Sequence, residues 1–69
     1  MEMHSVDSTS ITAIGYDEDS QTLQVEFVRG ASYQYFDVPL QIFEGMREAS
    51  SAGQYLNQQL RGIYRYSRV

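Results

Sequence analysis

A seven-residue stretch in the middle of the chain, Tyr33-Gln34-Tyr35-Phe36-Asp37-Val38-Pro39, constrains the fold more than any other. Side chains alternate between the two faces of a strand, and here both faces would carry large side chains. One face would carry Tyr33, Tyr35 and Asp37, and the other Gln34, Phe36 and Val38. The proline then ends the strand, because it has no amide proton to donate to a neighbour. The stretch therefore predicts a central strand, covered on most of both faces, around which the rest of the chain packs.

The length of 69 residues limits the chain to one small domain. A chain of this size buries only about 60% of its unfolded surface, so its stability margin is narrow. There is no cysteine, and therefore no disulfide or thiolate metal site to reinforce the core. Residues 1–9 lack periodicity and are expected to form a flexible leader, which leaves residues 10–69 as the single domain. With no apolar run of membrane-spanning length and no signal peptide, we expect a cytoplasmic protein without membrane association.

Alternating apolar residues predict a meander of three antiparallel strands. The expected strands cover residues 10–16, 23–29 and 32–38. The middle strand has the clearest pattern, since Leu23, Val25 and Phe27 alternate with polar residues, as in a strand with one buried and one wet face. Phe27 ends this apolar stripe, and we expect it to anchor the core. Gly30 supplies the positive φ that a tight hairpin needs before the third strand.

Two short helices are expected after the strands. Pro39 suits the first turn of a helix, and apolar residues recur at helical spacing over residues 42–49. Gly45 weakens this helix by about 1 kcal/mol relative to alanine and could allow a close approach to the sheet. Ser51 begins a capping box that opens the second helix, and Gly62 is the expected stop. The predicted fold class is α+β: a three-stranded antiparallel β-meander followed by two short α-helices packed on one face of the sheet.

The sequence offers no catalytic or metal-binding constellation. His4 is the only histidine and lies in the expected leader, so the serines have no base to activate them. The three consecutive acids at residues 17–19 lack the glycine and glutamate spacing of a calcium loop. We therefore expect a protein that is not an enzyme and that needs no cofactor and no metal.

Tyrosine and arginine are the residues with functional potential. Six of the 69 residues are tyrosine. Tyr33 and Tyr35 could fill a small core with their hydroxyls near the surface, or they could form a platform on which bases stack. The net charge is −4, but residues 54–69 carry three arginines and no acid. These cations either complement the end of a helix or contact phosphates.

The ordered set of motifs resembles the KTSC domain family. The resemblance rests on Tyr16-Asp17, Leu23-Gln24-Val25-Glu26-Phe27, Gly30, Tyr33-Gln34-Tyr35 and Asp37-Val38-Pro39, followed by Ala49-Ser50-Ser51-Ala52-Gly53, Tyr55, Asn57, Arg61-Gly62 and Tyr64. It covers roughly residues 6–69, which is nearly the whole chain. The family takes its name from a domain at the C-terminus of some lysyl-tRNA synthetases and also occurs as small stand-alone bacterial and phage proteins. The resemblance implies RNA binding as a candidate role.

Two hypotheses for function follow. The first is an accessory module that weakly binds single-stranded RNA or another single-stranded nucleic acid, with tyrosines that stack on bases and arginines that contact phosphates. The residues assigned to this site are Tyr33, Tyr35, Arg61, Tyr64, Arg65 and Arg68. The second is a protein-interaction module or small homodimer that pairs through an exposed strand edge and the aromatic tail. Arginines that share a face with exposed tyrosines would favour the first, whereas buried tyrosines together with arginines paired with Glu44 or Glu48 would favour the second.

Overall fold

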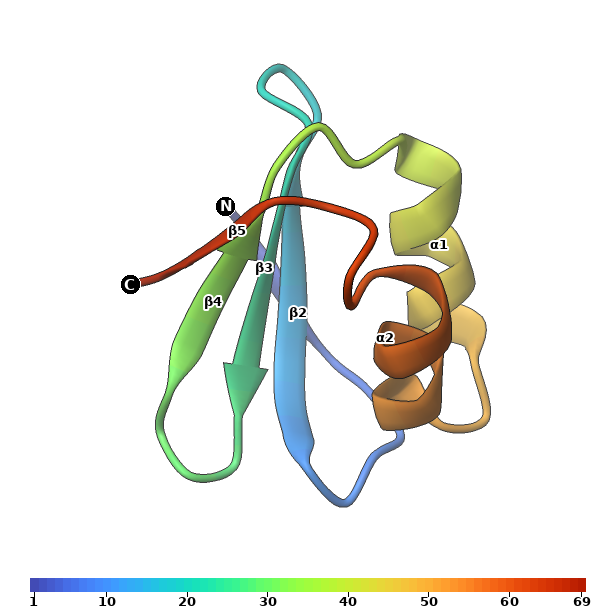
Figure 1. The fold of residues 1–69 in the computed structure, drawn as a ribbon. Coiled ribbons are helices and arrows are strands. Elements are labelled where there is room, and N and C mark those ends of the chain that lie inside the picture. Colours follow the sequence, from blue (N-terminus) through green and yellow to red (C-terminus); the bar gives the residue numbers. More distant parts are fainter.

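The computed structural model describes residues 1–69 and contains a five-stranded antiparallel sheet with two helices (Figure 1). The elements are β1 (Met3–Ser5), β2 (Ile11–Asp17), β3 (Thr22–Phe27), β4 (Ser32–Tyr35), α1 (Leu40–Glu48), α2 (Ala52–Gln59) and β5 (Tyr66–Arg68). Neighbouring strands follow the chain order, β1-β2-β3-β4-β5. Both helices lie on the same side of the sheet, which we call the inner face (Figure 1). The α+β class, with two helices packed against an antiparallel sheet, is therefore confirmed.

The hydrophobic core lies between the inner face and the two helices. Leu23 and Val25 of β3 are fully buried there, as the alternation of that strand predicts, and Ile14 of β2 pairs with Val25 beside them. The helices contribute the buried side chains of Met46 and Leu56. Polar residues of the same strands point the other way, so the inner face holds nearly all of the apolar surface that the chain can bury.

The outer face of the sheet is polar. Gln24 and Gln34 are directly opposite each other on β3 and β4, and the amide of Gln34 donates a hydrogen bond of 2.9 Å to the side-chain oxygen of Gln24. Gly15 lies in the same row on β2. A Cβ at Gly15 would lie 2.9 Å from the carbonyl oxygen of Glu2, so the glycine allows the close backbone approach of the N-terminal segment.

The sheet has five strands, not the three predicted from the sequence. Met3–Ser5, within the expected leader, forms β1 and pairs with β2. Tyr66–Arg68, in the tail, forms β5 and pairs with β4. Each added strand is only three residues long. It is defined by the strand with which it pairs rather than by an alternation of apolar and polar residues of its own. Whether the remaining residues of the leader are flexible stays a prediction.

The strand that begins at Ser32 is shorter than expected and does not lie at the centre of the sheet. β4 ends at Tyr35, and β3 is the middle strand. Asp37 adopts a φ of 58°, which is left-handed and interrupts the alternation of faces. Aspartate tolerates this conformation because its short side chain can form local hydrogen bonds. The chain is then held by Val38, whose amide donates to the carbonyl of Gln21 at 2.9 Å.

Phe27 is not the core anchor that the alternation of β3 predicts. Its side chain is half-buried and packs against the edge of the core. It is also the last residue of β3, where it pairs with Ile11 next to an irregularity in the register of β2. The space over its ring is an open groove rather than a helix, which explains why the burial of Phe27 is incomplete.

The helix ends follow the capping rules. Ser51 is the N-cap of α2, and its hydroxyl accepts a hydrogen bond of 3.3 Å from the amide of Gln54, as the capping box predicts. Pro39 lies just before α1, at a position where a backbone amide proton would have no acceptor within the helix. Gly62 has a φ of 79° beyond the end of α2. Neither helix has the length or the apolar character that a membrane span requires.

Gly45 allows a close approach, but to the second helix rather than to the sheet. A Cβ at this position would lie 2.9 Å from Cζ of Tyr55 and closer still to the tyrosine hydroxyl. Glycine is therefore retained at a helix position where alanine has the better intrinsic propensity. The tyrosine ring lies where the methyl group of alanine would be.

The effect of Gly45→Ala on the stability of the domain should change sign with the residue at position 55. In the natural chain the substitution should destabilise the domain by about 1 kcal/mol, because overpacking costs ~1–3 kcal/mol and helix propensity returns only ~1 kcal/mol. In a Tyr55→Leu background, which removes the ring atoms, the same substitution should stabilise by up to about 1 kcal/mol. Urea unfolding of the four proteins measures both effects. Stabilisation by Gly45→Ala in the natural chain would contradict this account.

Candidate functional site

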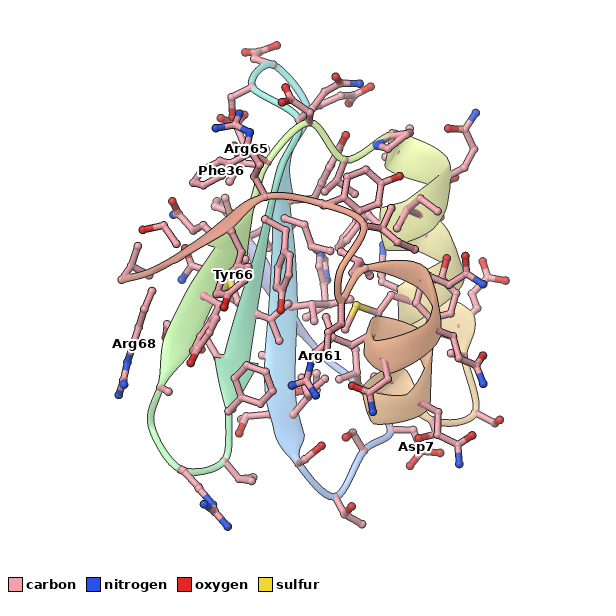
Figure 2. The ribbon with its side chains drawn as sticks, in the orientation of Figure 1. Asp7, Phe36, Arg61, Arg65, Tyr66 and Arg68 are labelled. Atoms are coloured by element: carbon pink, nitrogen blue, oxygen red, sulfur yellow. The ribbon has the colours of Figure 1, made fainter.

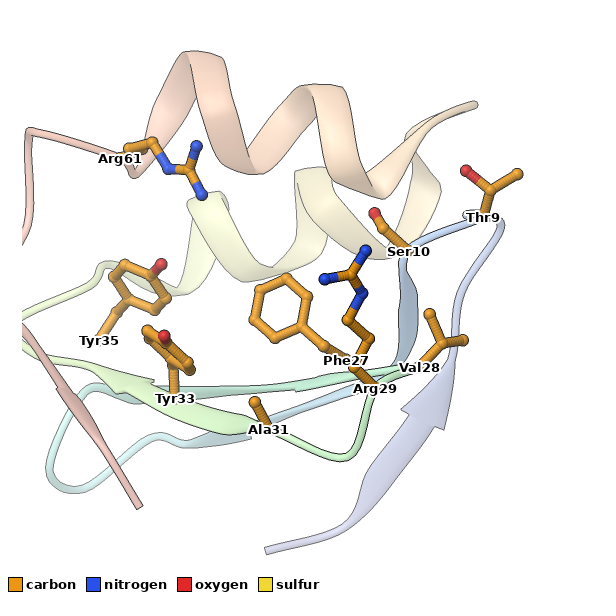
Figure 3. Close-up of a pocket in the computed structure, with 9 residues that line it drawn as sticks. All are labelled: Thr9, Ser10, Phe27, Val28, Arg29, Ala31, Tyr33, Tyr35 and Arg61. Atoms are coloured by element: carbon orange, nitrogen blue, oxygen red, sulfur yellow. The ribbon is translucent and has the colours of Figure 1, made fainter.

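A groove runs between the end of α2 and the part of the inner face that the helices leave uncovered. α1 contacts β2 and α2 contacts α1, and no helix covers the region over the end of β3 and over β4 (Figure 1). The groove has a cavity volume of about 420 Å³, which is within the range of ligand pockets. Its lining consists of Thr9, Ser10, Phe27, Val28, Arg29, Ala31, Tyr33, Tyr35 and Arg61 (Figure 3).

Four aromatic rings form a continuous cluster along this groove. Phe27 meets Tyr33 edge to face, with ring centroids 5.6 Å apart. Tyr33 stacks on Tyr66 at 5.6 Å with an interplanar angle of 21°. Tyr66 in turn contacts Tyr35 at 5.6 Å. We call Phe27, Tyr33, Tyr35 and Tyr66 the aromatic cluster.

The register of β4 and β5 places this cluster. Tyr35 is directly opposite Tyr66, and Tyr33 is directly opposite Arg68. The three tyrosines and Arg68 therefore project from the same face of the sheet. The rings are buried to very different degrees. Tyr35 is only 4% exposed and belongs to the core, Tyr33 is half-buried, and Tyr66 is 59% exposed. The cluster therefore joins the core to a solvent-accessible aromatic surface.

Three arginines surround the aromatic cluster. Arg61 lies at the Tyr35 end of the groove and Arg29 at the Phe27 end (Figure 3). Arg61 is held in the turn after α2, where its amide donates to the carbonyl of Leu56 at 2.9 Å. Arg68 is exposed on β5, two residues beyond Tyr66 and opposite Tyr33, and Figure 2 shows its side chain at the margin of the sheet.

The groove is cationic although the chain as a whole is acidic. None of the residues that line it is an acid. Asp17, Glu18 and Asp19 are in or beside the turn between β2 and β3, and Glu44 and Glu48 lie on α1. Because the acids are placed elsewhere, the net charge of −4 does not describe the local field at the arginines.

Three of the six residues assigned to the site from the sequence, Tyr64, Arg65 and Arg68, do not line the groove. Arg65 forms an ion pair of 3.1 Å with Asp37 and covers the ring of Phe36 at 5.5 Å from its centroid. Figure 2 shows Arg65 and Phe36 together, apart from Arg61. Tyr64 is half-buried and packs against the core. Tyr33, Tyr35 and Arg61 do meet at the groove, and Arg68 shares their face.

The sequence analysis did not assign Phe27 and Arg29, which line the groove, or Tyr66, which belongs to the aromatic cluster. Phe27 belongs to the apolar alternation of β3, but that pattern alone places it in the core rather than in a groove. Tyr66 alternates with polar residues in the tail, and its role depends on the pairing of β5 with Tyr35. Arg29 lies in the hairpin between β3 and β4, and only the folded chain brings it over the cluster.

The tyrosines of the core keep their protons at physiological pH. Burial raises the pKa of Tyr35 above its ordinary value of 10.0, and the positive charge of Arg61 opposes this effect without cancelling it. Burial likewise raises the pKa of Tyr16 and of Tyr55. The cluster thus presents a neutral buried ring beside exposed guanidinium groups. No three His, Cys, Asp or Glu side chains are grouped so that they could hold a metal ion.

Stability should fall as the pH rises above about 10. The unfolded chain releases its tyrosine protons near pH 10, whereas Tyr16, Tyr35 and Tyr55 in the folded chain keep theirs to higher pH. The loss of stability begins at the unfolded-state pKa and ends once the folded-state values are passed. The chain has no lysine or cysteine that would titrate in the same range.

Urea unfolding at pH 8 and pH 11 measures this loss. Tyr35→Phe should reduce the difference between the two free energies of unfolding, because it removes one of the three groups with a raised pKa. Tyr66→Phe, which removes an exposed hydroxyl from the same cluster, is the matched control. An equal loss in the natural chain and in Tyr35→Phe would show that this hydroxyl does not link folding to pH.

Comparison with known proteins shows similarity along nearly the whole chain. The KTSC domain family model matches residues 7–66. An uncharacterized protein of Stutzerimonas stutzeri strain A1501 is 39% identical over 70 aligned positions, which cover 100% of this chain and 99% of the relative. The crystal structure of a KTSC domain protein from Yersinia pestis superposes with a TM-score of 0.91 at 29% identity, over 99% of this chain and 96% of that one.

A second kind of relative is much longer. The lysine–tRNA ligase of Nostoc sp. strain PCC 7120 is 39% identical over 59 residues. This match covers 86% of the present chain but only 10% of the ligase. The similarity therefore concerns one small segment of that enzyme.

Proposed function

The chain belongs to the KTSC domain family, and from this membership together with its cationic aromatic groove we propose that it is a small non-catalytic accessory domain that binds single-stranded RNA. The observation that carries the proposal is the aromatic cluster bordered by three arginines with no acid in the lining. Proteins bind single-stranded nucleic acid through such a combination, in which bases stack on rings and cations follow the backbone.

Tyr66 and Tyr33 are the rings that a base can reach. Tyr66 is 59% exposed and Tyr33 is half-buried beneath the open groove, whereas Tyr35 is closed off and supports them from the core. A base that stacks on either ring would lie between Arg61 and Arg68, and the guanidinium groups could contact the phosphates on each side. Arginine suits this task because its planar group binds phosphate through two hydrogen bonds and also stacks on rings.

The relatives support RNA as the ligand class. A lysine–tRNA ligase contains a segment similar to this chain, and its name states that it acts on a transfer RNA. The proposal carries over the kind of ligand and none of the ligation reaction, because the match spans 10% of that enzyme. It also includes a cytoplasmic location, where RNA is available.

Affinity should be weak. Up to three phosphates can be neutralised by Arg29, Arg61 and Arg68, while the acidic remainder of the chain repels the same ligand at long range. This is consistent with an accessory role in which a second binding element supplies part of the free energy.

The protein-interaction hypothesis receives less support from the fold. The edge of β4 is paired with β5 of the same chain, so the free edges of the sheet are β1 and β5, whose three residues each give a partner strand little to pair with. None of the tail arginines forms an ion pair with Glu44 or Glu48, the arrangement that would have favoured this hypothesis. It becomes the preferred explanation if RNA binding fails.

Replacement of Arg61 or Arg68 should weaken RNA binding and also reduce its dependence on salt concentration. A labelled mixed-sequence RNA of eight nucleotides, titrated at low salt by fluorescence anisotropy, should show a slope of log K against log salt of about −2, from three contacts of about −0.7 each. Arg61→Gln or Arg68→Gln should make this slope less negative by about 0.7, because each variant loses one phosphate contact. Arg65→Gln is the matched control, since it removes the same charge at a residue that lies outside the groove, beside Asp37. No shift at high micromolar concentration of the natural protein would refute the proposal.

Removal of an exposed ring should weaken binding without changing the salt slope. Tyr66→Ala should lower the affinity by about tenfold, because the stacking of a base on an aromatic side chain contributes ~1–3 kcal/mol. Tyr66→Phe keeps the ring and should bind as the natural protein does. Equal affinities for the alanine and phenylalanine variants would exclude stacking at this position. Thermal melts of both variants show whether β5 stays paired.

A further inference from the structure

A second, polar cleft continues from the cationic aromatic groove along α2. The two share Thr9, Ser10, Phe27 and Arg61, so they form one surface with Arg61 at the junction. The cleft has a cavity volume of about 420 Å³. The further side chains that line it include Ser8, Gln54 and Asn57.

The fold holds hydroxyl and amide groups on both walls of this cleft. One wall is the loop between β1 and β2, where the Ser8 hydroxyl oxygen accepts a hydrogen bond of 3.0 Å from the amide of Ile11. The other wall is α2, whose Ala52 amide donates to the carbonyl of Asp7 at 3.1 Å and so ties the helix to the loop. Gly53 of α2 faces the Ser10 hydroxyl across the cleft, since a Cβ there would lie 3.0 Å from that oxygen.

The chemistry of the cleft differs from that of the groove. Its exposed side chains include Thr9, Ser10, Gln54 and Asn57, which are neutral groups able to donate and accept hydrogen bonds. Arg61 is its only charged residue, and Phe27, shared with the groove, is its only aromatic one. The cleft is therefore poorly suited to stack a base or to bind several phosphates, and well suited to a neutral hydroxyl-bearing group.

We infer that this cleft binds the ribose of the nucleotide that follows the stacked base, and that it recognises the 2′-hydroxyl and so favours RNA over DNA. The inference rests on the proposed function and deepens it. With a base on the aromatic cluster, the next phosphate is within the region of Arg61, and the sugar attached to that phosphate enters the cleft. The 2′-hydroxyl both donates and accepts hydrogen bonds, as do the side chains of Ser10 and Asn57.

The ligand itself provides the first test. The natural protein is titrated with the eight-nucleotide RNA and with its 2′-deoxy counterpart, in which deoxyuridine replaces uridine so that only the 2′-hydroxyls differ. We expect the RNA to bind more tightly by a factor of about 2–10, which corresponds to one net hydrogen bond. Equal affinities would overturn the inference and leave the proposed function standing. Failure of both ligands to bind would overturn the proposed function and the inference with it.

Variants on the two walls provide the second test. Ser10→Ala and Asn57→Ala should reduce the ratio of RNA to deoxy affinity toward one while they leave the affinity for the deoxy ligand unchanged. Gln58→Ala is the matched control, because it is exposed on the same helix but does not line the cleft. An equal weakening of both ligands would assign these side chains to phosphate or base contacts and overturn the inference. Tyr66→Ala should weaken both ligands alike, which separates the cleft from the aromatic cluster.

Discussion

The burial of a single apolar layer between the β2–β3 hairpin and two short helices holds this domain together. The helices have nine and eight residues, so each is only about 12–14 Å long. α1 lies against β2 and α2 against α1, and two helices of this length cannot also cover the far side of a five-stranded sheet. The chain closes that side with aromatic side chains instead of a third helix. The site thus arises from the way in which a small domain completes its core.

The aromatic cluster consequently has two roles that follow from one arrangement. Tyr35 seals the core and supports Tyr66, which faces solvent. Rings that close a core are rigid and already desolvated on one side, so a stacked ligand loses little further conformational freedom. The arginines lie at the margin of the same surface, where their charges stay hydrated and no acid in the lining neutralises them. The local arrangement, rather than the net charge, decides what this surface can bind.

Local patterns in the sequence predict the parts of the fold that local interactions determine. The alternation of Leu23 and Val25 and the cap at Ser51 are of this kind, and both are confirmed. Local patterns do not predict β1 and β5, because a three-residue strand forms only when it pairs with a neighbouring strand. The same limit applies to the site. The sequence indicates stacking rings and phosphate-binding cations, but only the register of β5 separates Arg68, opposite Tyr33, from Arg65, which is paired with Asp37.

Both the aromatic surface and the edge of β4 depend on the pairing of β5 (Tyr66–Arg68) with β4. Three exposed residues supply the outermost ring of the cluster and one of its cations, and they also cover the edge of β4. Separation of β5 from β4 would displace Tyr66 and Arg68 and uncover the edge of β4 in the same event. Exposed strand edges promote aggregation, so loss of this one pairing would disrupt the aromatic surface and favour self-association together.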